Sequence, residues 1–186
     1  MARTPSNMLP LNTAAPDFDL IDTITDKQLT LGDIAGEKGT VIMFICNHCP
    51  FVIHVNPEIV KMAQEYQPKG IGFVAVSSND IINYPQDAPH LMKQKAAEEG
   101  YTFPYLFDET QEVARAYDAA CTPDFYLFDS DLKLAYRGQL DDSRPGNGVP
   151  LTGSDLRNAM EALLKGDAID SNQKPSIGCN IKWTAD

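Results

Sequence analysis

The sequence predicts an α/β sandwich around a mixed central β-sheet. Segments with strand-like and helix-like patterns alternate between residues 40 and 119. After them come two strand-like segments joined by a short turn, and then one amphipathic helix. Strand–helix–strand connections favour parallel neighbours, whereas a short turn favours an antiparallel pair. We expect one domain over residues 1–186, with a core of about 16–165 and a tail at 167–186.

The first part of the chain predicts a β-hairpin and then a buried strand. Apolar and polar residues partly alternate over residues 17–24 and 28–31, with a polar turn between them. The polar stretch 32–39 leaves room for one helical turn. Residues 40–45 are almost all β-branched or aromatic, which is typical of a strand buried on both faces.

This strand ends at a C-x-x-C pair, Cys46 and Cys49, and a helical pattern follows. A second N-cap signal at Asn56-Pro57 predicts a short helix over residues 47–55, a break, and a second helix over 57–66. Two thiols therefore lie where a central strand ends and a helix begins. The unpaired N–H groups and the dipole of a helix N-terminus favour a thiolate there.

The rest of the chain continues the alternation. Residues 78–89 are polar, contain two prolines and predict a loop that lines a site, and residues 141–153 predict a second long loop. The remaining predicted elements are strands at 71–77, 103–107, 125–128 and 132–137 and helices at 90–99, 112–119 and 154–165.

Composition narrows the functional classes. The net charge of −11 argues against binding to nucleic acid or to anionic membranes. No apolar run approaches the roughly 20 residues that span a bilayer. The first 16 residues lack the apolar segment of a secretory signal, so we expect a cytoplasmic protein. In that compartment a C-x-x-C pair indicates redox chemistry or metal binding.

The redox interpretation gives each residue of the motif a role. Cys46 is expected to attack a disulfide as a thiolate with a lowered pKa, and Cys49 to resolve the mixed disulfide. His48, beside Asn47, is placed to donate a hydrogen bond to that thiolate or to bring positive charge near it. No cofactor is expected, because the electrons pass through protein or small-molecule thiols and disulfides. A structural cysteine pair and half of a zinc site remain as alternatives.

Two segments carry a resemblance to a known family. Residues 44–50 read Phe-Ile-Cys-Asn-His-Cys-Pro, and residues 121–129 begin Cys-Thr-Pro. Together they resemble the thioredoxin-like superfamily, within its AhpC/TSA branch, which also holds the peroxiredoxins. The chain is similar to a subgroup of thioredoxin family proteins with this CNHC motif and a Ser-Ile-Gly-Cys tail, here residues 176–179.

The resemblance implies a thioredoxin-like three-layer α/β/α sandwich with a central mixed β-sheet and an added N-terminal β-hairpin. It implies a cis proline at Pro123 facing the C-x-x-C motif, with the backbone of Thr122 open to a substrate peptide. The activity implied is that of a thiol–disulfide oxidoreductase in cell redox homeostasis. A peroxiredoxin-like peroxidase is the first alternative, with Arg115 or Arg137 as the supporting arginine.

The roles of the other two cysteines, Cys121 and Cys179, stay open. Cys121 lies two residues before Pro123, so it is a possible second resolving thiol, a metal ligand, a target for glutathione, or a small buried hydrophobe. Cys179 belongs to a tail that we expect to be docked, either over the site or against another chain. A metal or iron–sulfur module built on Cys46, Cys49 and one of these two is the second alternative. The sequence leaves the oligomeric state undetermined.

Overall fold

The computed structural model describes residues 3–185. Its strands are β1 (Arg3–Pro5), β2 (Asp19–Asp22), β3 (Gln28–Thr30), β4 (Gly39–Phe44), β5 (Ile71–Ser77), β6 (Tyr105–Phe107), β7 (Cys121–Thr122), β8 (Asp124–Asp129), β9 (Leu134–Gly138) and β10 (Ile177–Asn180). Its helices are α1 (Leu31–Ile34), α2 (Pro50–Tyr66), α3 (Pro89–Glu99), α4 (Glu112–Ala116) and α5 (Ser154–Lys165), with 3-10 turns at Gln67–Lys69 and Pro85–Asp87.

The central sheet is mixed, as the sequence predicts. Its strands run in the order β3-β2-β6-β5-β4-β8-β9. β4 pairs parallel with β5 and antiparallel with β8, so the strand that leads to the two thiols lies inside the sheet. The predicted N-terminal hairpin is confirmed as β2 and β3, which pair antiparallel at one edge.

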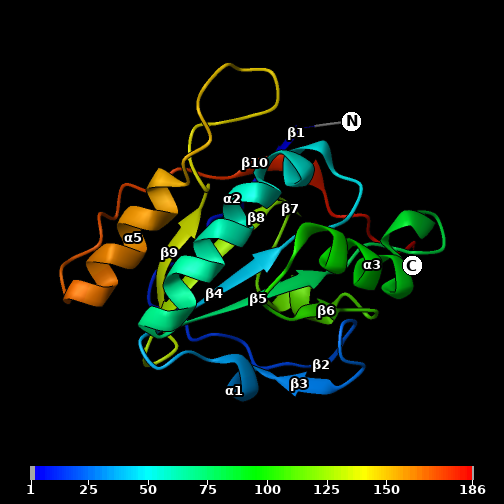
Figure 1. The fold of residues 1–186 in the computed structure, drawn as a ribbon, viewed down its shortest axis with the longest axis horizontal. Helices are drawn as coiled ribbons and strands as arrows, with labels where there is room; N and C mark the ends of the chain where they lie inside the picture. The colour runs from blue at the N-terminus through cyan, green and yellow to red at the C-terminus, as the bar shows by residue number, and fades with distance from the viewer. Residues whose placement is uncertain (1–2, 186) are drawn as a thin grey trace.

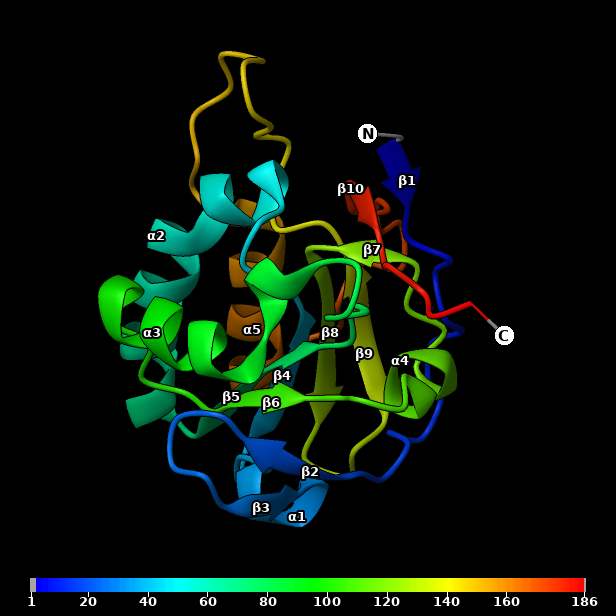
Figure 2. The same cartoon turned by 90° about the vertical axis from the view of Figure 1, so that its right-hand side faces the viewer.

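Both faces of β4 are covered, which explains its uninterrupted apolar sequence. Val41 and Met43 belong to an apolar cluster shared with α2, α3 and α5. Ile42 and Phe44 belong to a second cluster on the opposite face, shared with α4. Figure 2 shows α2, α3 and α5 on one side of the sheet and α4 on the other. The alternation follows from the two-residue period of a strand.

The predicted break in the helix after the thiols is wrong. α2 runs from Pro50 to Tyr66 as one helix, and Pro57 lies inside it. A proline in a helix interior removes one N–H, which leaves the carbonyl of Ile53 without its usual partner. The side chain of Ile53 is half exposed, so this turn of the helix lies at the surface. Packing of the buried face of α2 on the sheet outweighs the local cost of the proline.

A second small sheet joins the two ends of the chain, and the sequence did not predict it. β10 lies between β1 and β7 and pairs antiparallel with both. Figure 1 shows the three strands close to the N-terminal end of α2, beside the end of β4. The expectation that the tail is docked is confirmed. Among the described residues, no helix is long and apolar enough to cross a membrane.

Candidate redox site

The two thiols lie at the start of α2, but the helix begins later in the chain than the sequence predicted. The helix begins at Pro50, and Cys49 is its N-cap residue. Cys46 and Asn47 therefore precede the helix, whereas we expected them within or next to its first turn. Of the two cysteines, only Cys49 is placed to accept hydrogen bonds from the N–H groups of the helix terminus. Its sulfur accepts hydrogen bonds from the backbone N–H groups of Val52 and Cys179.

The loop between β7 and β8 faces both thiols. The Thr122–Pro123 peptide bond is cis, as the resemblance implied. The Sγ of Cys46 lies 3.6 Å from Thr122 Oγ1, across 76 residues of sequence. The Sγ of Cys49 lies 3.3 Å from the Thr122 carbonyl oxygen, to which the protonated thiol donates. Thr122 thus contacts both sulfurs, one through its side chain and the other through its backbone.

The backbone of Thr122 is not open to a substrate peptide, so that expectation is wrong. β10 occupies it, with Cys179 opposite Thr122 in the antiparallel register. The Sγ of Cys179 lies 2.9 Å from the Sγ of Cys49. This tail strand helps to bury the site: Cys46 is 2% exposed and Cys49 is fully buried.

The thiolate is favoured on Cys49 rather than on Cys46. Hydrogen bonding to Cys46 lowers the pKa of Cys49, and hydrogen bonds from Cys179 and from the helix N-terminus lower it further against the cost of burial. The pKa of Cys46 is raised well above its usual value by its hydrogen bond to Cys49, by burial and by the charge of Asp87. The expectation of a lowered pKa at Cys46 is therefore wrong. The physical reason is that the N–H groups at the start of α2 hydrogen-bond to Cys49 and not to Cys46.

His48 pairs with a carboxylate that the sequence did not single out. Its Nδ1 lies 2.6 Å from Oδ2 of the fully buried Asp87, and its ring stacks on Tyr84. Burial raises the pKa of Asp87, but hydrogen bonds from His48, Asn79 and Asn47 outweigh it, so the net shift is downward. Any positive charge on His48 is therefore matched by a carboxylate. The only sequence signal for Asp87 was its place in the polar loop 78–89.

Asn47 fixes the loop between the two cysteines. Its backbone N–H donates to Asp87 Oδ1 at 2.8 Å, and its side chain donates to the Gln86 carbonyl at 2.9 Å. Its Oδ1 accepts from the hydroxyl of Tyr105 at 3.0 Å. Asn47 therefore ties the C-x-x-C loop to the segment that carries Asp87 and to the buried end of β6.

Cys121 is buried behind the site. It lies on β7 opposite Asn180, and its thiol contacts the carbonyl of Pro123 at 3.8 Å. Burial and the neighbouring Asp124 raise its pKa strongly. These surroundings are those of a small buried hydrophobe, which is one of the roles left open for it.

Cys46, Cys49 and Cys179, three cysteines of the metal-site alternative, contact one another through Cys49 but do not form a group whose ligand atoms all lie within 4.8 Å. Among residues 3–185, the one compact group of potential ligand atoms is Cys46, His48 and Asp87, which lie within 4.8 Å of one another. This group offers three ligand atoms, of which one is a sulfur, whereas a structural zinc site needs four ligands. Asp87 is also occupied by three hydrogen-bond donors.

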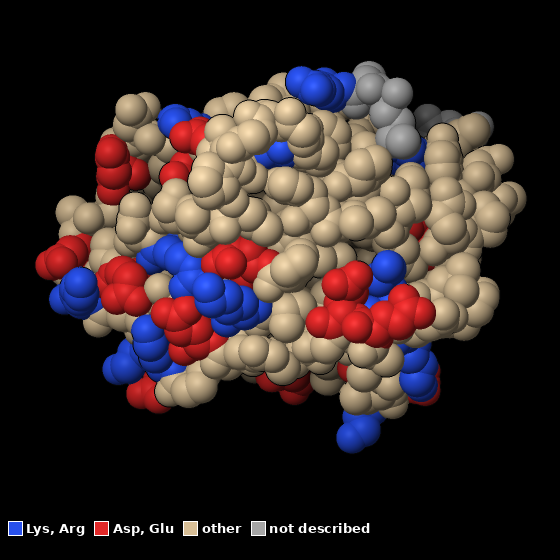
Figure 3. Space-filling view, turned by 45° about the horizontal axis from the view of Figure 1, so that its top comes forward, with Lys and Arg blue, Asp and Glu red and all other residues tan. Residues whose placement is uncertain are grey.

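A shallow hollow lies beside the C-x-x-C loop. Its volume is about 250 Å³, and Asn47, His48, Gln86 and the side chains of α3 line it. Figure 3 brings this end of the molecule forward and shows a broad area without charged side chains, with acidic and basic groups gathered mainly below it. The charged residues that line the hollow are Lys95 and Glu98 of α3.

A cis-proline loop facing two cysteines at the junction of a central strand and a helix defines a thioredoxin-like fold. The thioredoxin domain of a thiol-disulfide oxidoreductase from Bacteroides vulgatus has this fold, with a TM-score of 0.65 over 84% of this chain and 99% of that one at 20% identity. Within the thioredoxin-like proteins the chain belongs to the AhpC/TSA family, whose pattern matches residues 11–137.

Two further relatives lie closer in sequence. An uncharacterised conserved protein from Geobacillus kaustophilus is 59% identical and superimposes with a TM-score of 0.99, over 100% of this chain and 98% of that one. The thiol-disulfide oxidoreductase ResA of Geobacillus thermodenitrificans is 28% identical over 132 residues, which is 70% of each chain.

Proposed function

We propose that this protein is a thiol–disulfide oxidoreductase in which Cys46 and Cys49 alternate between a dithiol and a disulfide. The observation that carries the proposal is the position of both sulfurs against Thr122, at 3.6 and 3.3 Å, where β4 ends and α2 begins. The similarity to ResA, a protein named for this activity, supports it. The proposed partners are protein or small-molecule disulfides and thiols, and the proposed setting is cell redox homeostasis.

In the proposed reaction Cys46 attacks the disulfide of a partner. Cys49 is enclosed between Thr122 and Cys179, so the attack on the partner is assigned to Cys46. The proton of Cys46 passes to His48, which Asp87 orients through the 2.6 Å contact. One partner thiolate leaves, and a mixed disulfide joins Cys46 to the rest of the partner.

The second step closes the internal disulfide. The Cys49 thiolate attacks the sulfur of Cys46, the bond between Cys46 and the partner breaks, and the second partner thiolate leaves. The partner gains two electrons and the two cysteines lose them. A thiolate on Cys49 rather than on Cys46 suits this step, because the resolving sulfur is the one that must be ionised when the mixed disulfide exists.

Trapping tests this proposal. In Cys49→Ser the mixed disulfide cannot be resolved, so partners are expected to accumulate on Cys46 under oxidising conditions, as seen by non-reducing electrophoresis and mass spectrometry. Cys121→Ser is the matched control and is expected to trap nothing, because both site cysteines remain. If Cys49→Ser formed no adduct at Cys46 with any disulfide, the proposal would be refuted.

The peroxidase alternative receives less support from the geometry. Arg115 lies over the ring of Trp183, and Arg137 bonds to the Leu9 carbonyl and to Gln173. Neither of the two arginines considered for peroxide binding has a contact with Cys46 or Cys49 among the described interactions. Peroxide consumption with dithiothreitol, measured beside insulin reduction, separates the two activities. The cytoplasmic location stays a prediction.

A further inference from the structure

The tail strand lies on the site in the way an extended peptide would. β10 pairs with Thr122 through Cys179 and with Cys121 through Asn180, while β1 covers its other edge. Gly178 makes this approach possible, because a Cβ at that position would lie 1.8 Å from the Thr122 carbonyl oxygen. The close contact therefore depends on a glycine next to the cysteine.

The strand is anchored on both sides of Cys179. Before it, Ser176 donates its hydroxyl to the Pro123 carbonyl at 2.5 Å. After it, the backbone N–H of Lys182 donates to Asn79 at 2.9 Å, and the Lys182 carbonyl accepts from Gln111 at 2.8 Å. These partners belong to loops and strands far apart in the sequence. The position of Cys179 is thus fixed by the folded core rather than by a loose end of the chain.

The sulfur of Cys179 lies in contact with the sulfur of Cys49. The two sulfurs are 2.9 Å apart, and a disulfide bond is about 2.05 Å long. A small approach of the two side chains therefore suffices for a bond. Cys49 also hydrogen-bonds to Cys46, so it has a thiol neighbour on either side.

We propose that Cys179 is a third redox-active cysteine, which exchanges with the Cys46–Cys49 disulfide. This inference rests on the proposed function, which supplies that disulfide. The Cys179 thiol loses its proton and attacks the sulfur of Cys49. A Cys49–Cys179 bond forms, the Cys46–Cys49 bond breaks, and Cys46 leaves as a thiolate that takes up a proton. Two cysteines are oxidised before and after the step, so no further oxidant is needed.

The consequence is a relay of the disulfide from Cys46 to the tail strand. Cys46 becomes a thiol again while the disulfide is kept at Cys49 and Cys179. Cys46 is then ready to meet a second partner, and the reverse exchange returns the disulfide to Cys46. The tail strand that covers the site would in this way also take part in its chemistry.

A variant without Cys46 tests the exchange directly. Cys46→Ser is treated with the small thiol oxidant diamide, digested without reduction and mapped by mass spectrometry. A peptide pair linked through Cys49 and Cys179 is expected. The double variant Cys46→Ser/Cys179→Ser, which keeps Cys49 and Cys121, is the matched control and is expected to lose this link. If Cys49 and Cys179 both stay alkylatable in Cys46→Ser, the relay is refuted.

Partial oxidation of the unaltered protein gives a second measurement that does not depend on folding of a variant. Both the Cys46–Cys49 and the Cys49–Cys179 linked peptides are expected. Finding the first link alone in the unaltered protein would overturn the relay and leave the proposed function standing. Finding neither link would overturn both.

Discussion

At the scale of single residues, Asp87 sets the charge around Cys46. It is fully buried, it pairs with His48, and it accepts from the backbone of Asn47. Its negative charge disfavours a thiolate on Cys46 and so helps to direct ionisation toward Cys49. The hydrogen bond to Cys49 and burial raise the pKa of Cys46 more, and the charge of Asp87 adds to them.

We therefore predict that Asp87→Asn lowers the pKa of Cys46. The amide removes the nearby negative charge and retains the size of the side chain. The measurement is the rate of iodoacetamide labelling of Cys46 as a function of pH. It is made in the Cys49→Ser background, so that Cys46 is the only thiol left in the C-x-x-C motif. Asp80→Asn is the control, because Asp80 bonds to Asn83 and not to His48. An unchanged Cys46 profile in Asp87→Asn would show that the charge of Asp87 does not reach this sulfur.

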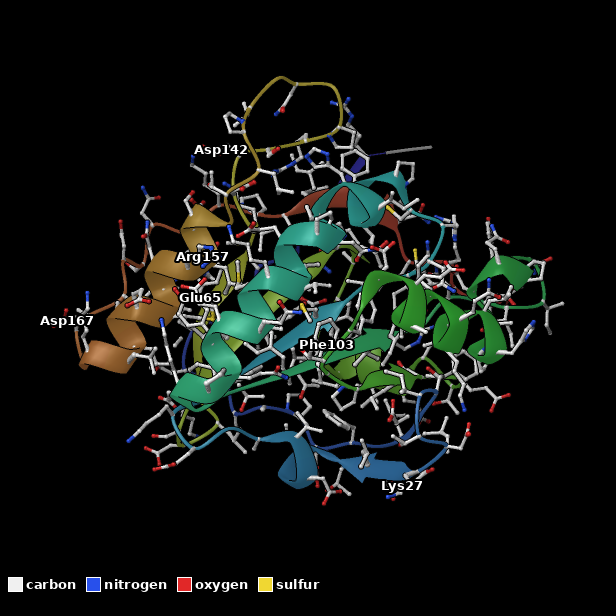
Figure 4. All side chains as sticks on the ribbon, in the orientation of Figure 1. Lys27, Glu65, Phe103, Asp142, Arg157 and Asp167 are labelled. Carbon is white, nitrogen blue, oxygen red and sulfur yellow. The ribbon has the colours of Figure 1, made fainter. Side chains whose placement is uncertain are left out.

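At the scale of elements, the position of α2 depends on α5 as well as on the sheet. Arg157 of α5 bonds to Glu58 at 2.6 Å and to Glu65 at 2.5 Å, and both acids belong to α2. In Figure 4 the labelled side chains of Arg157 and Glu65 point toward each other between the two helices. Burial of the guanidinium opposes its charge, and the two carboxylates raise the pKa of Arg157 in spite of it.

We predict that Arg157→Met lowers the free energy of unfolding by about 1–3 kcal/mol, because it leaves the buried Glu58 without its cation. Urea denaturation followed by circular dichroism measures the change. Lys69→Met serves as a comparison, since Lys69 pairs with Glu65 and Glu161 but is 43% exposed, and surface pairs contribute little. Equal losses in the two variants would contradict the importance given to burial.

At the scale of the whole molecule, the two chain ends meet at the site. Ser6 donates its hydroxyl to Asp124 Oδ1 at 2.8 Å and accepts from the backbone N–H of Ser176 at 2.8 Å. Asp124 follows Pro123 directly, so the N-terminal strand, the tail and the cis-proline loop share one hydrogen-bonded centre. Burial raises the pKa of Asp124 to about 7, against hydrogen bonds from Ser6 and Tyr126.

A buried acid of this kind makes stability depend on pH. The unfolded chain releases the proton of Asp124 near pH ~4, and the folded protein holds it to about pH 7. The folded state thus binds more protons in this window, and its stability falls as the pH rises through it, by up to about 4 kcal/mol. We predict that Asp124→Asn flattens this fall. Unfolding free energies from urea titrations at about pH 5 and about pH 8 measure it.

The reference for this prediction is the exposed Asp142, whose pKa is lowered by hydrogen bonds from Gln139 and Lys174. Asp142→Asn removes a carboxylate without removing a buried proton, so the fall between the two pH values should persist. If Asp124→Asn showed the same fall as the unaltered protein, another group would be responsible for it.

The sequence by itself determined the features that depend on neighbouring residues. The apolar run of β4, the two thiols at its end and the amphipathic α5 were predicted, because each has a local pattern of several residues. The cis proline of the Thr122–Pro123 loop was expected from the family resemblance, not from a local pattern. The helix break at Pro57 was predicted wrongly. The local N-cap and proline pattern contains no information on how much a whole buried helix face gains by packing on the sheet.

Only the tertiary structure decided which groups meet at the site. Thr122 and Cys179 reach the thiols across 76 and 130 residues of sequence, and Asp87 reaches His48 across 39. β1, β7 and β10 have two to four residues each, which is too short for a period to appear in the sequence. The choice of Cys49 as the thiolate likewise depends on the residue at which α2 begins and on what lies against each sulfur. The physical reason is that hydrogen bonds and burial, which shift a thiol pKa, come from groups brought together by folding.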